Sequence, residues 1–129
     1  MVPITAFYGS LMGLLLVYLA VRVTLCRRQH KIGLGDGGNR ELNVLMRAHA
    51  NAVENTPITL LLMLFAELNG LAVMHLHTIG ILLVASRLAH AQGFIFSGGA
   101  AAPGRLFGIS VSWLLIVALA IINVVLTYR

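Results

Sequence analysis

Charged residues and cysteines are scarce in this chain. Only 10% of its residues are charged and four of the 129 are acidic, whereas 59% are hydrophobic. This composition excludes an ordinary soluble domain of this length. The single cysteine, Cys26, excludes a disulfide scaffold, and we interpret it as an unreactive thiol at a helix end. The net charge of +5 comes mainly from arginines at or beside the apolar runs, a pattern typical of membrane topology and anion binding rather than of nucleic-acid binding.

Four apolar runs account for almost the whole chain, and each is long enough to cross a bilayer as a helix. They span residues 4–25, 41–68, 76–96 and 106–128. No removable signal peptide is expected, because the first run begins almost at Met1, exceeds the usual length and has no basic stretch before it. We therefore predict an all-α fold, an integral membrane four-helix bundle that forms a single domain over residues 1–129.

The basic residues between the runs predict the orientation of this bundle. The first connection contains Arg27, Arg28 and Lys31, the third contains Arg105, and the second contains neither Lys nor Arg. Because positively charged loops favour the cytoplasmic side, we expect both basic loops in the cytoplasm and both termini on the other side.

The second run carries an unusual polar stripe in its first half. At about 100° per residue, Arg47, Asn51, Glu54 and Asn55 share one helix face. A charged group near the bilayer centre costs about 2.5 to 3.5 kcal/mol, so this face should meet protein, water or a ligand rather than acyl chains. Pro57, where the polar and apolar halves meet, is expected to kink the helix and open room beside the stripe.

Two further groups of polar residues complete this constellation. Arg87 and His90 lie one turn apart in the third run, with Phe94 another turn along, and Arg105 directly precedes the fourth run. Together with the second-run stripe they supply guanidinium, carboxylate, amide and imidazole groups. Arginine binds carboxylates through paired charge-assisted hydrogen bonds, so the set predicts a site for a small zwitterionic molecule with several anionic groups. An interhelical ion-pair network of Arg47, Glu54 and Arg87 that serves packing alone is the alternative.

Other motifs exclude two further kinds of site. The glycine-rich segment 33–39 reads as a turn and lacks the strand and the Gly-Lys-Ser/Thr ending of a phosphate-binding loop. His75 and His77 are two residues apart, a spacing that cannot place both on one helix face. We therefore expect no metal site.

The chain resembles the family of membrane-associated proteins in eicosanoid and glutathione metabolism (MAPEG), especially its small bacterial members. The resemblance rests on four motifs: Arg47-Ala48-His49-x-Asn51-x-x-Glu54-x-x-Pro57, Gly35-Asp36-Gly37-Gly38, Arg87-x-x-His90-x-x-x-Phe94 and Pro103-x-Arg105. It covers almost the whole chain in the number, order and length of the spans.

This resemblance implies a homotrimer in a bacterial inner membrane, with glutathione as cosubstrate at cytoplasmic-side subunit interfaces. It implies conjugation of glutathione to lipophilic electrophiles or reduction of lipid hydroperoxides, with lipophilic small molecules as second substrates. The residues that would bind glutathione are Arg47, Asn51, Glu54, Arg87 and His90, with Arg22 or Arg27 from a neighbouring subunit. Arg105 would be catalytic, because it would lie near the glutathione sulfur, and Phe94 would line the cavity for the lipophilic substrate.

Two other functions remain open at this point. A small proton-coupled multidrug exporter has a similar length and span number, but the exporters that we would compare carry their essential glutamate in the first span. Here that span has no carboxylate, and Glu54 accompanies Arg47 in the second. A non-catalytic membrane trimer whose polar groups serve only packing is the other alternative.

Overall fold

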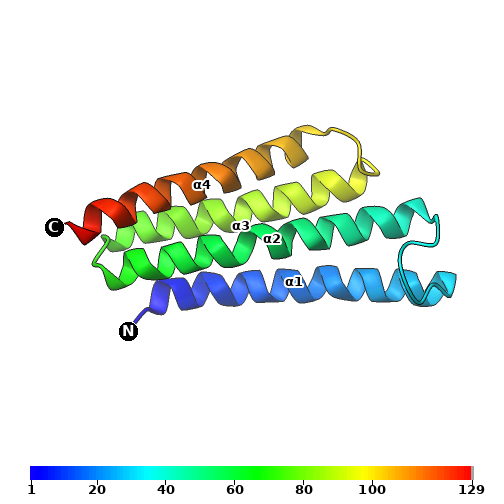
Figure 1. The fold of residues 1–129 in the computed structure, drawn as a ribbon, viewed down its shortest axis with the longest axis horizontal. Helices are drawn as coiled ribbons and strands as arrows, with labels where there is room; N and C mark the ends of the chain where they lie inside the picture. Colours follow the sequence, from blue (N-terminus) through cyan, green and yellow to red (C-terminus); the bar gives the residue numbers. More distant parts are fainter. Residues whose placement is uncertain (129) are drawn as a thin grey trace.

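The computed structural model describes residues 1–128 and contains, within them, four helices and no strand. The helices are α1 (Pro3–His30), α2 (Arg40–Leu68), α3 (Val73–Phe96) and α4 (Pro103–Thr127), and they form an elongated up-and-down bundle (Figure 1). Helices α2 and α3 lie between the other two, and within the described residues α1 and α4 do not contact each other. The predicted all-α membrane bundle is confirmed.

Both chain ends lie at one end of the bundle, and the connections 31–39 and 97–102 lie at the other (Figure 1). We call the latter the loop end. Because successive helices are antiparallel, the loop end gathers the end of α1, the beginning of α2, the end of α3 and the beginning of α4. The basic connections predicted from the sequence therefore lie at one end of the molecule.

Helix α1 continues past the apolar run, whose last residue is Leu25, because the polar residues that follow still favour helix and the end is well capped. Lys31 adopts the left-handed conformation, and the Lys31 and Ile32 amides donate to the Arg28 and Arg27 carbonyls. Helix α2 begins with an equally definite cap, in which the Asn39 side chain accepts a hydrogen bond from the Leu42 amide. Both helix ends at the first connection are thus fixed.

Three of the helices, α1, α3 and α4, are long and apolar enough to cross a membrane. Helix α2 is similarly long but carries the polar stripe in its first half, and it continues through Pro57 as one helix. The exposed surfaces of the outer helices are rich in large apolar side chains, such as Leu14 and Val17 on α1 and Trp113 and Val117 on α4. A surface of this kind fits contact with lipid.

Glycine and serine allow α3 and α4 to approach closely near the loop end. A Cβ on Gly93 would lie 2.5 Å from the backbone nitrogen of Arg105, and one on Gly108 would overlap the Ser86 carbonyl and the His90 side chain. Small residues at membrane helix interfaces permit such backbone contact. This contact sets the position of Arg105, at the first turn of α4, against the last turns of α3.

Candidate functional site

Arg87 lies at the centre of the polar constellation, and it is 1% exposed. Its Nη1 donates to the Asn51 side-chain oxygen at 2.9 Å and its Nη2 to the Gly108 carbonyl at 3.0 Å, so it joins α3 to α2 and α4. Its Nε atom has no hydrogen-bond partner within the described residues. The predicted neighbours Arg87 and Asn51 are therefore in direct contact, and Arg87 holds the Asn51 amide in place.

His90, Phe94 and Arg105 form a second group between Arg87 and the loop end. The rings of His90 and Phe94 lie 5.8 Å apart, and the Arg105 guanidinium lies over the Phe94 ring at 4.3 Å from its centre. Arg105 Nη1 donates to the carbonyls of Gly99, at 2.6 Å, and Ala100, at 3.2 Å. A cation over an aromatic face with two carbonyl acceptors is held firmly, and within residues 1–128 its Nε and Nη2 atoms donate no hydrogen bond.

Arg47 and Glu54 lie on the exposed side of α2, whereas Ala48, Ala52 and Thr56 on its other side are buried. The polar stripe therefore faces outward from the single chain. Neither Arg47 nor Glu54 forms an ion pair within residues 1–128, where the one ion pair joins His30 and Glu41. The predicted packing network of Arg47, Glu54 and Arg87 is not formed in one subunit.

Arg22 and Arg27, which the sequence did not distinguish, have different surroundings. Arg27 is engaged within its own chain, since Nη1 donates to the Gly35 carbonyl at 2.8 Å and Nη2 contacts the Met46 sulfur at 3.3 Å. Arg22 donates to the Tyr18 hydroxyl at 2.9 Å and lines two cavities. Arg22 is therefore the more available of the two cations.

The two cavities meet at Arg22 and Ile95. One, of about 510 Å³, is an apolar groove between α1 and α3 with Tyr18 and Arg22 among its lining residues. The other, of about 310 Å³, lies at the loop end and is lined by Arg22, Arg40, Glu41, Val44, Leu45, Ile95 and Gly98. Neither is lined by Phe94, so its role in the lipophilic cavity stays a prediction.

Apart from Arg27, the predicted site residues fall into four groups in the structure. Asn51 joins Arg87 inside the bundle, the His90–Phe94–Arg105 group lies between them and the loop end, and Arg22 lines cavities on the α1 side. Arg47 and Glu54 lie on the same face of α2 as Asn51, and both side chains are exposed.

Sequence reasoning missed Arg40, whose Nη2 donates to the Gly98 carbonyl at 3.3 Å next to the carbonyl bound by Arg105. Its position at the start of α2, four residues before Val44 on the same face, was the available signal.

Comparison with known proteins identifies the family of the chain. The MAPEG family model matches residues 5–125. The chain is also 38% identical, over 125 residues, to proteins named inner membrane protein YecN from Escherichia coli strains K12 and O6:H1, and the match covers 93% of this chain and 89% of each relative. The family match covers almost the whole chain, and the chain belongs to the MAPEG family.

Proposed function

We propose that the protein is a glutathione-dependent transferase or peroxidase of a bacterial inner membrane, active as a homotrimer. The observation that carries the proposal is the open Arg47–Glu54 face beside the fixed Asn51. An arginine and a glutamate on an outward face of a membrane helix, without an ion pair to any of the described residues, call for a partner that brings both charges. Glutathione is such a partner, because it has carboxylates for Arg47 and an ammonium for Glu54.

In the proposed trimer, a second subunit supplies this face with a further cation. The available Arg22 lies on the α1 side of the bundle, and neither Arg47 nor Glu54 lines the two cavities that Arg22 lines. In a closed trimer each subunit can offer its α1 side to the α2 face of the next, so a tripeptide held by Arg47 and Glu54 can also meet a neighbour's Arg22. The apolar groove that ends at Arg22 then provides space for a lipophilic second substrate.

Arg105 is proposed to stabilise the glutathione thiolate. A thiol of pKa about 8.5 is only a few per cent ionised at pH 7, and lowering that pKa by two units requires about 2.7 kcal/mol of preferential anion stabilisation. Arg105 has free guanidinium nitrogens and lies in the first turn of α4, where the helix dipole also favours an anion. Its hold on the Gly99 carbonyl and the Phe94 ring fixes the charge before substrate binds.

The chemistry then follows from the thiolate. With a chloronitrobenzene, sulfur attacks the ring carbon, a C–S bond forms, and chloride leaves with the electrons of the C–Cl bond. With a lipid hydroperoxide, sulfur attacks the terminal oxygen and the O–O bond breaks, which gives a glutathione sulfenic acid and an alkoxide. The alkoxide takes up the proton that the thiol released and becomes the alcohol. A second glutathione reduces that acid to the disulfide and water. In both reactions the protein supplies proximity and charge stabilisation.

The test is conjugation of glutathione to a chloronitrobenzene by purified protein in detergent, measured from pH 6 to pH 9. We expect Arg105→Ala to lose roughly 25-fold in rate at pH 7, because the thiolate fraction falls to a few per cent, and to recover as the pH passes about 8.5. Arg28→Ala, which removes an exposed arginine at the end of α1, is the matched control and should keep the wild-type profile. Equal profiles for Arg105→Ala and wild type, with both trimeric, would remove Arg105 from this role.

A further inference from the structure

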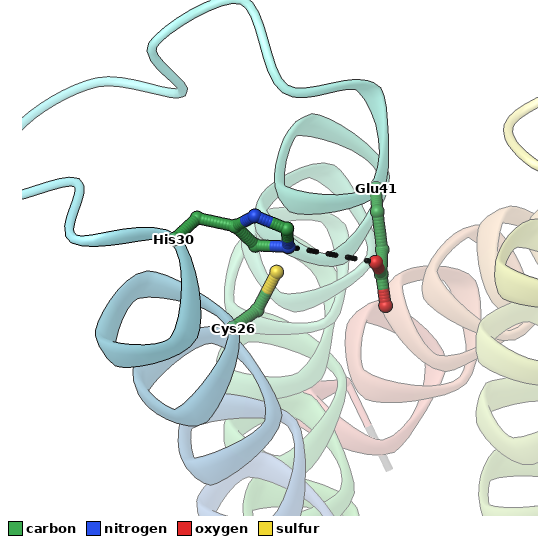
Figure 2. Close-up of side chains that lie close together, drawn as sticks. All are labelled: Cys26, His30 and Glu41. Atoms are coloured by element: carbon green, nitrogen blue, oxygen red, sulfur yellow. Dashed lines mark ion pairs between the residues drawn. The ribbon is translucent and has the colours of Figure 1, made fainter.

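Three residues with metal-binding side chains meet at the loop end, and none of them is among the proposed glutathione ligands. They are Cys26 and His30 in the last two turns of α1 and Glu41 in the first turn of α2 (Figure 2). The Cys26 sulfur, a ring nitrogen of His30 and a carboxylate oxygen of Glu41 all lie within 4.8 Å of one another. In Figure 2 the thiol and the imidazole point from α1 toward the Glu41 carboxylate. We propose that these residues bind a divalent zinc-type metal ion.

Helix spacing and helix caps hold the three ligand residues close together in the absence of a metal. Cys26 and His30 are four residues apart, so both side chains lie on the same face of α1. Lys31 and Ile32 cap the end of α1, and Asn39 caps the beginning of α2, so both ligand-bearing turns are fixed. The Arg27 guanidinium holds the connection through the Gly35 carbonyl. The ligand positions therefore do not depend on the flexible glycine-rich segment between them.

The distances are close to those of a bound ion. Zinc bonds of about 2.3 Å to sulfur and about 2.0 Å to nitrogen and oxygen place tetrahedral ligand atoms roughly 3.3 to 3.5 Å apart. The observed His30 Nε2 to Glu41 Oε2 distance is 4.0 Å. The side chains of His30 and Glu41 are 35% and 68% exposed, so both can close on an ion by a small rotation. Buried Cys26 is the fixed ligand of the three.

The donor set selects the class of metal. A thiolate, an imidazole and a carboxylate suit zinc and related ions, whereas magnesium and calcium prefer oxygen ligands alone. Binding displaces the Cys26 thiol proton to solvent, and the resulting thiolate and the Glu41 carboxylate balance the two positive charges of the ion. Three protein ligands leave a fourth position for water or another donor. The ion would clamp the end of α1 to the beginning of α2.

Cobalt is the probe for this site, because a cobalt–thiolate bond absorbs in the near ultraviolet and reports the Cys26 ligand directly. Full-length protein without a histidine tag is purified in detergent, treated with chelator and titrated with Co²⁺, and zinc is then added to displace the cobalt. We expect one equivalent of Co²⁺, a thiolate charge-transfer band, and loss of that band on addition of zinc. Bound zinc should also raise the apparent thermal stability, because it binds only the folded state.

Single variants separate the metal site from the His30–Glu41 ion pair. Cys26→Ser keeps that pair but should abolish the band, and Glu41→Gln should weaken affinity by more than the roughly 10- to 100-fold loss typical of residues that only support a ligand. His75→Ala, at the opposite end of the bundle, is the control and should bind as wild type. Cobalt binding without the thiolate band, or equal affinity in folded Cys26→Ser, overturns the proposal, as does the absence of binding by wild type.

Discussion

Replacing Arg87 by methionine should leave the bundle at least as stable as the wild type, although Arg87 is the largest fully buried side chain. The guanidinium has two protein acceptors, Asn51 and Gly108, and its Nε atom is without a partner within the described residues. No carboxylate of those residues forms an ion pair with it. A buried cation of this kind carries a desolvation cost that methionine does not.

The sign of the expected change in unfolding free energy follows from the sizes of the opposing contributions. Two hydrogen bonds from a charged donor contribute about 1.5 to 3 kcal/mol each. Against them stand a desolvation penalty of several kcal/mol and about 1 to 3 kcal/mol for the unpaired Nε. Well-packed apolar replacements of buried charges are often neutral or stabilising by about 1 to 4 kcal/mol. We therefore expect Arg87→Met to change the unfolding free energy by between zero and about +3 kcal/mol.

Asn51→Ala is the informative counterpart, because it removes one acceptor and leaves the buried charge. It should destabilise the protein by about 1.5 to 3 kcal/mol. Both values can be measured by reversible unfolding in mixed micelles of a mild detergent and dodecyl sulfate. Arg87→Met should also weaken glutathione binding by about tenfold, since Asn51 loses the contact that positions it. Any clear loss of unfolding free energy in Arg87→Met would show that Arg87 stabilises the fold, and would refute the reasoning.

Three further predictions concern the rest of the bundle. Glu67 caps α1 by accepting hydrogen bonds from the Ile4 amide at 3.0 Å and the Thr5 amide at 2.7 Å. Glu67→Ala should therefore lower the unfolding free energy by about 1 to 2 kcal/mol in the same micelle assay, and an unchanged value would contradict the capping role. A methyl group on Gly80 would overlap the Tyr8 ring, so Gly80→Ala should lower the unfolding free energy by about 1 to 3 kcal/mol. The control Gly13→Ala, whose added methyl group would have nothing within 4 Å, should leave the unfolding free energy unchanged or raise it slightly. The Asp36 carboxylate accepts hydrogen bonds from the Gly38 amide and the Asn43 side chain, and these bonds lower its pKa. Protection of the Gly38 amide against hydrogen exchange should therefore be complete above the ordinary pKa of about 3.9 and be lost as the pH falls through the lowered pKa. Asp36→Asn should remove this pH dependence.

The sequence allowed the fold to be predicted because each helix carries its own signal. Long apolar runs identify membrane helices whatever surrounds them, and the basic connections locate one end of the bundle. The ends were less well predicted: α1 continues to His30, since charged residues outside an apolar run are still good helix formers.

The parts of the site that escaped sequence reasoning depend on contacts between distant residues. Helical spacing predicted that Asn51 faces a polar region, but the position of Arg87 opposite it depends on how α3 packs against α2. The cap of α1 by Glu67 and the approach of Glu41 to Cys26 also join different helices. Spacing within a helix defines a face, whereas the partner of that face is set by packing in three dimensions.

Unfolding of the purified protein at increasing glutathione concentration tests the central claim most directly, since that claim assigns glutathione to the face of Arg47, Asn51 and Glu54. A ligand that binds only the folded state should raise the apparent unfolding free energy with the logarithm of its concentration, by about 2.7 kcal/mol at 100 times Kd. The rise should be lost in Glu54→Gln. A trimer that is intact but equally stable with and without glutathione would contradict the assignment.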